Sequence, residues 1–301
     1  MTFTTKIKDE ITKLDENIIE SLVTLHTYLY YNAEINYDNI MILTENASGA
    51  RYIFKLFKTH YNISIRLTVR VQKKFKIKNI YILTIKEKVN LIKDDIKNTI
   101  LNIKESSLEE QVAFLKGVFL ATGSVNDPSK SKYHLEFLID KESDAYLVLD
   151  ILKNLNYNIK IIKRTKGYMV YLKSSEEISD FIKLLNAINS LFYYEDIRIY
   201  RDHKNMVNRL NNCEQANMEK IIKTCNEQID NINYLMSHDL IDLLDEKIQV
   251  AINYRLKYPE TSLSELASII SLETNYQITK SGINHYFRKI KELVEKDKFK
   301  V

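Results

Sequence analysis

The sequence predicts an α+β protein in which two tandem α/β repeats form a pseudo-twofold saddle and an all-α unit follows them. The segment SLVTLHTYLYYNAEI at 21–35 matches QVAFLKGVFLATGSV at 111–125, and each copy continues with a strand, a polar turn, a second helix and a basic hairpin. From residue 208 onward, apolar residues recur at helical spacing. These observations divide the chain into two repeats, a connecting helix and an all-α unit, over residues 1–95, 96–207, 208–238 and 239–301.

The composition is typical of a soluble globular protein, because 45% of the 301 residues are hydrophobic and 28% are charged. No apolar stretch approaches the length of a membrane span, and the N-terminus MTFTTKIKDEITKL lacks the apolar core of a signal peptide. We therefore expect a cytoplasmic protein without membrane contact. Its two cysteines, Cys213 and Cys225, are expected to be reduced thiols and not a disulfide or a metal site.

The net charge of +4 conceals three basic patches. Residues 63–93 carry a local charge of +8, residues 152–173 carry +6 and residues 279–301 carry +4, so the rest of the chain carries −14. Basic charge concentrated on an otherwise acidic chain favours a polyanionic partner, most simply nucleic acid. A solvated lysine face is the alternative interpretation of any single patch.

The first basic hairpin contains a strand, IRLTVRV at 65–71, in which apolar and polar residues alternate. Its apolar side chains are expected to pack on helices, and its other face, with Arg66 and Arg70, could lie along a DNA phosphate backbone. In the second hairpin, Lys163 and Arg164 are the candidates for such contacts. An ordinary solvent-facing sheet is the alternative. The strand residues whose apolar side chains are expected to pack on helices are Ile65, Leu67, Val69 and Val71.

The first helix of the second repeat carries small residues that would allow another helix to approach closely. Gly117 and Ala121 lie four residues apart on one helix face. The segment LKGVFLATGS at 115–124 resembles the LAGLIDADG motif of homing endonucleases, and residues 25–34 resemble a more altered copy. The resemblance implies a saddle in which the two motif helices pack together.

In those endonucleases the eighth motif position is an acid in each copy, and the two acids hold divalent metal for phosphodiester cleavage. In this sequence the corresponding residues are Asn32 and Thr122. An amide and a hydroxyl lack the anionic oxygen that magnesium requires, so we expect no catalytic residue, no metal and no cofactor. Two alternatives stay open: a nuclease that uses displaced acids such as Glu34 or Asp127, and a repeat module that docks protein partners, with incidental DNA binding.

The C-terminal segment predicts three helices. A helix over 239–257 is stopped by Pro259, and Ser262 with Glu265 forms a capping box that opens the next helix. A linker over 271–278 precedes the final helix, which presents an apolar stripe to its neighbours. The residues of this stripe are Ile283, Phe287, Ile290 and Val294.

The other side of the final helix carries residue types that suit DNA recognition. Arginine and asparagine can read guanine and adenine in the major groove, lysine and serine can hold phosphates, and Thr279 or Ser281 can cap the helix. His285 has no Cys or His companion at ligand spacing, so a metal role is not expected. We interpret residues 262–295 as a helix-turn-helix. Its candidate residues for binding double-stranded DNA are Thr279, Lys280, Ser281, Asn284, His285, Arg288 and Lys289.

The sequence also resembles the WhiA family of bacterial regulators over nearly its whole length. The resemblance rests on KSGINHYFRKI at 280–290, on the preceding LSELASII, on GVFLATGSVNDPSKSKYHLEF at 117–137 and on the opening KIKDEITKL. It implies a degenerate LAGLIDADG module joined to a helix-turn-helix that reads DNA. It further implies roles in transcription control, cell division, chromosome segregation and, in some lineages, sporulation. Tyr286 and Phe287 depart from the family pattern of a basic residue and a leucine.

Overall fold

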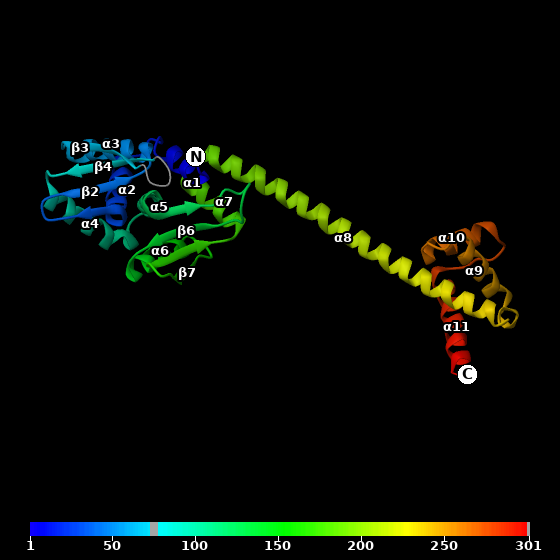
Figure 1. The fold of residues 1–301 in the computed structure, drawn as a ribbon. Coiled ribbons are helices and arrows are strands. Elements are labelled where there is room, and N and C mark those ends of the chain that lie inside the picture. Colours follow the sequence, from blue (N-terminus) through cyan, green and yellow to red (C-terminus); the bar gives the residue numbers. More distant parts are fainter. Residues whose placement is uncertain (73–77, 300–301) are drawn as a thin grey trace. The chain divides into compact units, whose positions relative to one another are not determined.

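The computed structural model describes residues 1–72 and 78–299, which fall into two compact units (Figure 1). The first unit covers residues 1–202 and the second covers residues 203–301. Part of the first basic patch, residues 73–77, lies outside the described residues. None of the helices in the described ranges combines the length and the hydropathy of a membrane span.

Two repeats with the same order of elements follow the short helix α1 (Phe3–Ile11) in the first unit. The first repeat consists of α2 (Ile18–Asn32), β1 (Ala33–Ile35), β2 (Ile40–Thr44), α3 (Ala47–Tyr61), β3 (Ile65–Gln72), β4 (Lys78–Ile85) and α4 (Val89–Asn102). After a 3₁₀ turn, η1 (Ile103–Glu105), the second repeat consists of α5 (Leu108–Thr122), β5 (Gly123–Val125), β6 (Leu135–Ile139), α6 (Glu142–Asn154), β7 (Lys160–Lys163), β8 (Tyr168–Leu172) and α7 (Ser175–Leu184). The predicted repeat and the α+β fold class are therefore confirmed.

Each repeat contributes one antiparallel sheet, and the two sheets have the same topology. The strand orders are β1-β2-β4-β3 and β5-β6-β8-β7. The register is equivalent as well, because Ala33 pairs with Ile42 in the first sheet and Gly123 pairs with Phe137 in the second. Figure 1 shows the first sheet in blue to cyan and the second in green. Matching topology and register are what a pseudo-twofold relation between the repeats requires.

The two motif helices α2 and α5 pack against each other inside the first unit. Thr24 Oγ1 donates to the backbone oxygen of Ala113 across this contact, at 3.2 Å. A Cβ atom at position 117 would lie 2.6 Å from Thr27 Cβ and 2.9 Å from the backbone oxygen of Thr24. No side chain fits there, so the close helix approach predicted at Gly117 is confirmed.

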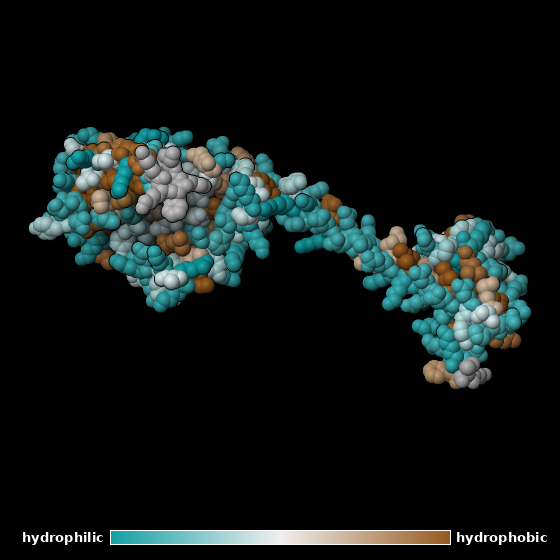
Figure 2. Space-filling model, viewed as in Figure 1, coloured by the Kyte–Doolittle hydropathy of each residue, from teal (hydrophilic) through white to brown (hydrophobic). Residues whose placement is uncertain are grey.

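The apolar face of β3 departs from the sequence prediction. Leu67, Val69 and Val71 do not pack on helices, because each of these side chains is about half exposed. β3 is the edge strand of its sheet, so its side chains have a neighbouring strand on one side only. Within β3, only Ile65 packs against the core. Figure 2 shows hydrophobic surface, in brown, over the part of the first unit that contains β3 and α3.

A buried histidine on α2 connects three helices of the first repeat. The side chain of His26 is buried; its Nδ1 lies 2.7 Å from Thr99 Oγ1 and its Nε2 lies 2.7 Å from Tyr61 Oη. Tyr61 Oη donates to Asp95 Oδ2 at 2.9 Å. Burial lowers the pKa of His26 to about 4, although the nearby Asp95 carboxylate opposes this shift. The ring is therefore neutral in the folded protein near pH 7.

The first unit is expected to lose stability as the pH falls from about 6.5 to about 4. In this window the unfolded chain binds a proton at His26 that the folded unit excludes, because the folded pKa is the lower one. The contribution of this residue to the loss should reach roughly 2–3 kcal/mol at pH 4. Calorimetric unfolding of the wild type and His26→Gln between pH 4 and 8 measures it, since the stability advantage of the wild type should shrink with falling pH. A difference independent of pH would contradict this account.

The connecting helix predicted over 208–238 begins earlier, because α8 runs from Ile188 to Ser237. Glu10 of α1 caps its first turn. The Glu10 carboxylate accepts hydrogen bonds from the backbone N–H groups of Asn189, at 2.6 Å, and Ser190, at 3.0 Å. α8 therefore starts within the first unit, and its later part belongs to the second.

The second unit is all-α, with a hydrophobic core of its own. The end of α8 packs there with α9 (Glu246–Lys257), α10 (Leu263–Glu273) and α11 (Lys280–Lys298). The prediction of one helix over 239–257 is wrong at its start, because a 3₁₀ turn, η2 (Ile241–Leu243), precedes α9 there.

Two local predictions for the second unit are confirmed. Ser262 and Glu265 form the capping box at the start of α10, with Ser262 Oγ accepting from the Glu265 N–H at 3.3 Å and Glu265 Oε2 accepting from the Ser262 N–H at 3.1 Å. The whole predicted apolar stripe of α11 is buried. The predicted linker over 271–278 is shorter than expected, because α10 continues to Glu273.

Candidate nucleic-acid interface

Helix α11 begins at a defined cap and a fixed connector. Thr279 Oγ1, one of the two predicted caps, accepts a hydrogen bond from the Gly282 N–H at 3.2 Å. In the connector, Ser271 Oγ accepts from the Ile278 N–H at 3.0 Å and donates to the Ile278 carbonyl at 3.2 Å. The first N–H groups of α11 have no acceptor within the helix, and the helix dipole favours an anion there.

The structure brings all of the candidate DNA-binding residues to the solvent side of α11 and its cap. Lys280, Asn284 and Arg288 follow one another at four-residue steps and span about 12 Å along the helix axis. That length corresponds to roughly three to four base pairs of B-form DNA. The opposite side of the helix carries the buried stripe, so one face packs and the other is available for binding. The exposed candidates are Thr279, Lys280, Ser281, Asn284, His285, Arg288 and Lys289.

The two basic residues at the middle of this face are held only by weak surface interactions. Arg288 Nε lies 3.7 Å from Glu292 Oε1, and Arg288 Nη2 lies 3.4 Å from His285 Nδ1. Lys289 Nζ lies 4.0 Å from Asp245 Oδ2. Exposed pairs of this kind contribute about 0–1 kcal/mol, so either side chain can leave its partner for a phosphate or a base.

The charge of α11 is concentrated in its first part. Residues 280–291 contain four basic residues and no acid. The acids of the helix, Glu292, Glu295 and Asp297, all follow this segment. Within α11, positive charge is therefore concentrated in the part that carries the candidate base-reading side chains.

In the first hairpin, Arg66 and Arg70 lie on the face of the sheet that points away from the core. They stand opposite Thr84 and Ile80 of β4, whereas the neighbouring Leu83 is buried on the other face. Both arginines are exposed. Their predicted separation from the apolar face is confirmed, and their contact with a DNA backbone stays a prediction.

The second hairpin presents its basic residues differently. Lys163 pairs with Tyr168 at the end of β7, on the same face as Ile161, which packs against the core. Its Nζ lies 6.0 Å from the centre of the Tyr168 ring. Arg164 follows in the turn, with Nη2 3.4 Å from Met169 Sδ. Both side chains are exposed, but neither lies in a row on the outer sheet face as Arg66 and Arg70 do.

Asn32 and Thr122 occupy equivalent positions, as the last residues of α2 and α5. Asn32 Nδ2 donates to Tyr28 Oη at 3.0 Å, and Thr122 Oγ1 donates to the backbone oxygen of Val118 at 3.1 Å. Each polar group therefore has a partner in its own helix, and Asn32 Nδ2 also lies 3.4 Å from the backbone oxygen of Leu43 in β2. Neither side chain carries the anionic oxygen that a divalent metal needs.

The two displaced acids lie in unlike surroundings. Glu34 is exposed on β1, opposite Met41. Asp127 lies in the turn after β5, where its Oδ1 accepts from the Ser129 N–H at 2.9 Å, from Ser129 Oγ at 2.7 Å and from Tyr193 Oη at 3.1 Å. Partial burial raises the pKa of Asp127, but these hydrogen bonds outweigh burial and hold the pKa below its ordinary value. Asp127 therefore organises its own turn.

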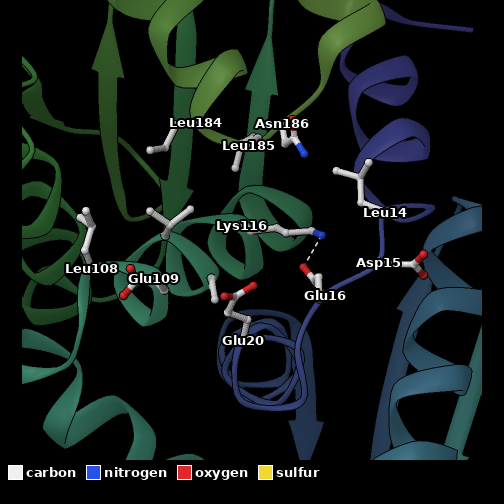
Figure 3. A pocket seen from close by; sticks show the side chains of 12 residues that line it. Leu14, Asp15, Glu16, Glu20, Leu108, Glu109, Lys116, Leu184, Leu185 and Asn186 are labelled. Carbon is white, nitrogen blue, oxygen red and sulfur yellow. Dashed lines mark hydrogen bonds and ion pairs between the residues drawn. The ribbon is translucent and has the colours of Figure 1, made fainter.

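A cavity in the first unit is lined by several acids and one buried lysine (Figure 3). Its volume is about 310 Å³. Lys116 extends toward Glu16 and forms an ion pair with it, and Tyr52 Oη donates to the other oxygen of that carboxylate. Burial lowers the pKa of Lys116, while the charge of Glu16 opposes the shift. Glu20 and Glu109 contribute further carboxylates to the lining.

This cavity lies far along the motif helices from Asn32 and Thr122. Lys116 precedes Thr122 by about 9 Å along α5, and Glu20 precedes Asn32 by about 18 Å along α2. The acids of the cavity therefore do not replace the missing motif acids. Across the described ranges, no group of three or more His, Cys, Asp or Glu residues is arranged to hold a metal ion.

A buried arginine next to α11 was not among the residues predicted from the sequence. Arg255 is fully buried, and its guanidinium lies 5.5 Å from the centre of the Phe287 ring. A signal for it existed, because Arg255 continues the stripe of Ile248, Ala251 and Ile252 at helical spacing. A charged residue at a core position requires polar partners, and these are two carbonyls of the chain between α9 and α10 and, at 3.4 Å from Nη1, Cys225 Sγ of α8.

Three sequence models of one family match the chain, in order. They are the WhiA N-terminal LAGLIDADG-like domain over residues 30–97, the WhiA LAGLIDADG-like domain over residues 111–204 and the WhiA C-terminal HTH domain over residues 207–294. The candidate DNA-binding residues of α11 all fall within the third match.

Relatives match over almost the whole chain. A protein of Bacillus cytotoxicus named "Probable cell division protein WhiA" is 38% identical over 310 residues, which cover 98% of this chain and 97% of the relative. A protein of the same name from Enterococcus faecalis is 38% identical over 312 residues, covering 98% of each chain. The crystal structure of full-length WhiA from Thermatoga maritima matches with a TM-score of 0.58 at 23% identity, covering 98% of this chain and 99% of that one, which is a likeness of fold.

Proposed function

The chain belongs to the WhiA family, and we propose that it is a sequence-specific DNA-binding regulator without nuclease activity. The observation that carries the proposal is the solvent face of α11. It combines an open helix start, a row of polar and basic side chains about 12 Å long and a first part free of acids. These are the features that a helix needs in order to enter the major groove.

In the proposed complex, Asn284 and Arg288 read base edges, because an amide pairs in a bidentate way with adenine and a guanidinium with guanine. Lys280, Ser281 and Lys289 hold backbone phosphates, and the first N–H groups of α11 donate hydrogen bonds to another phosphate. Thr279 fixes the start of the helix and so sets the register of these side chains. Sequence readout and nonspecific affinity therefore come from different residues of one helix.

The saddle of the first unit supplies further backbone contacts in this proposal. Arg66 and Arg70 are exposed on the face of β3 that points away from the core. Contacts with phosphates by these arginines add affinity for any sequence and no discrimination between bases. The absence of nuclease activity is inferred from Asn32 and Thr122, whose neutral side chains stand where the family of homing endonucleases has its metal-binding acids.

The relatives named as probable cell division proteins support a role in the bacterial cell cycle. We propose that DNA binding by α11 regulates transcription linked to cell division and chromosome segregation, and that the protein acts in the cytoplasm on the nucleoid. The net charge distribution supports this location, because the basic patches favour a polyanion.

Selection from a random pool of double-stranded DNA tests the proposed specificity. The full chain is incubated with the pool at about 0.15 M salt, where nonspecific phosphate contacts are weakened, and the retained duplexes are sequenced over several rounds. A short shared motif is the expected result. Retention of duplexes without any shared motif would refute sequence-specific binding.

No cleavage of DNA is expected under conditions that suit a LAGLIDADG nuclease. Supercoiled plasmid that carries the selected motif should stay intact in magnesium or manganese, because the motif positions provide no carboxylate. Gel analysis of nicked and linear forms measures this. Nicking by the wild type that disappears in a Glu34→Ala/Asp127→Ala double variant would show that displaced acids replace the motif acids.

A further inference from the structure

A cavity of about 230 Å³ in the second unit lies between α8, the end of α9, the start of α10 and the start of α11. Its polar lining consists of basic and hydroxyl side chains and the thiol of Cys225, and none of the described residues that line it is an Asp or Glu. Two lysines, Lys220 and Lys280, line the cavity, and neither forms an ion pair with an acid among the residues that the structure describes. The polar residues that matter for its chemistry are Lys220, Thr224, Arg255, Ser262, Ser264 and Lys280.

Arg255, which lines this cavity, has hydrogen-bond donors without an acceptor. Its Nη1 is satisfied, because it donates to the backbone oxygen of Thr261 at 2.6 Å and lies 3.3 Å from that of Tyr258. Its Nε and Nη2 are buried and have no partner among the described residues. The guanidinium is buried, so its charge is poorly solvated, and this burial lowers the pKa of Arg255. Unpaired buried donors on a charged group are costly, and an anion would remove that cost.

The start of α10 adds a second, independent source of positive potential. Its capping box satisfies the N–H groups of Ser262 and Glu265. The N–H groups of Leu263 and Ser264, in the first helical turn, have no acceptor within the helix, and both residues line the cavity. Main-chain donors at a helix start and an adjacent guanidinium are a recurrent combination for binding phosphate oxygens.

We propose that this cavity binds a phosphate group. Arg255 and the first N–H groups of α10 hold its oxygens, and Lys220 and Lys280 neutralise its charge at the rim. The same chemistry suits a backbone phosphate of DNA and a free phosphate or phosphorylated small molecule. Binding of a DNA phosphate rests on the proposed function, because Lys280 also opens α11. Binding of a free phosphate or a phosphorylated small molecule is independent of that function. The two sources are separated by experiment.

Three variants of the full chain test the site. Lys220→Gln removes a charge from the rim, and Lys223→Gln removes the same charge one turn further along α8, at an exposed residue that does not line the cavity. Arg255→Lys keeps a positive charge, but one ammonium group cannot serve both the Thr261 carbonyl and an anion in the cavity. Calorimetric unfolding measures whether each variant folds. If Arg255→Lys does not fold, Lys220→Gln still tests the site.

The first arm uses inorganic phosphate against chloride at constant ionic strength, without DNA. Binding is followed by the amide shifts of Leu263 and Ser264. Saturable binding to the wild type is expected, with affinity about tenfold lower in Lys220→Gln, lost in Arg255→Lys and unchanged in Lys223→Gln. The second arm measures the dependence of duplex DNA affinity on salt. If the phosphate is that of DNA, the slope of log affinity against log salt should fall by about 1 in Lys220→Gln and not in Lys223→Gln.

An effect in the first arm alone identifies a free phosphate as the ligand, and an effect in the second arm identifies the DNA backbone. If Lys220→Gln and Lys223→Gln behave alike in both arms, the proposal is overturned. A wild-type protein that binds no DNA would contradict the proposed function, and the first arm would still decide whether the cavity binds phosphate.

Discussion

Arg288→Ala should remove discrimination at one base pair of the recognised site while leaving the fold intact. A bidentate contact between a guanidinium and guanine contributes about 1–3 kcal/mol of discrimination, so the preference at that position should fall by roughly 5- to 150-fold. The side chain is 69% exposed and its pair with Glu292 is a weak surface interaction, so stability should hardly change. Competition between the selected duplex and its single-base variants measures the effect.

Lys289→Ala provides the matched control for this prediction. Lys289 is the neighbouring exposed residue of α11, and its replacement should weaken binding to all sequences about equally and reduce the salt slope by about 1. Arg288→Ala should therefore change the preference between bases, whereas Lys289→Ala should change only the overall affinity. An Arg288→Ala protein with unaltered preference at every base pair would show that α11 is not the reading helix.

Gly117→Val should severely destabilise the first unit. The new Cβ would lie 2.6 Å from Thr27 Cβ and 2.9 Å from the backbone oxygen of Thr24, at the contact between α2 and α5. Neither neighbour is the end of a flexible side chain, so the helices would have to separate, at a cost of about 3 kcal/mol or more. Calorimetric unfolding of the full chain measures the loss.

Gly49→Ala is the control for the effect of removing a helical glycine. At this position in α3 the nearest atom to a new Cβ would be Asn46 Oδ1, at 3.6 Å, which is an ordinary contact distance. Alanine is favoured over glycine within a helix by about 0.5–1 kcal/mol, so this variant should be as stable as the wild type or slightly more stable. Equal stabilities of Gly117→Val and Gly49→Ala would contradict the close contact between α2 and α5.

The features that could be predicted from the sequence are those set by neighbouring residues. The capping box of Ser262 and Glu265 needs only a spacing of three, and the buried stripe of α11 needs only the helical period. The repeat was visible because Leu25 and Leu115 begin similar segments. The spacing of three between Ser107 and Glu110 also predicts a capping box. This box starts α5 and was not among the predictions made from the sequence.

The features that could not be predicted depend on residues distant in the chain. α8 starts at Ile188 because Glu10, near the N-terminus, caps it. The exposure of Leu67 follows from the position of β3 at the edge of its sheet, which alternation along the strand does not reveal. The unpartnered donors of Arg255 lie beside a cavity lined by four helices, so no single segment of sequence indicates it.

In the proposed function, α11 reads DNA sequence and the saddle does not. Capture of sheared genomic DNA at about 0.15 M salt with three full-length proteins distinguishes these two parts. These are the wild type, an α11 variant (Asn284→Ala/Arg288→Ala) and a sheet variant (Arg66→Ala/Arg70→Ala), and the retained DNA of each is sequenced. All four replaced side chains are exposed, so the three proteins should fold alike.

One short motif is expected in the DNA retained by the wild type. The sheet variant should recover the same motif with lower yield, because it loses only contacts that are independent of sequence. The α11 variant should retain DNA without the motif. Recovery of the wild-type motif by the α11 variant, together with its loss in the sheet variant, would show that the saddle and not α11 reads the sequence.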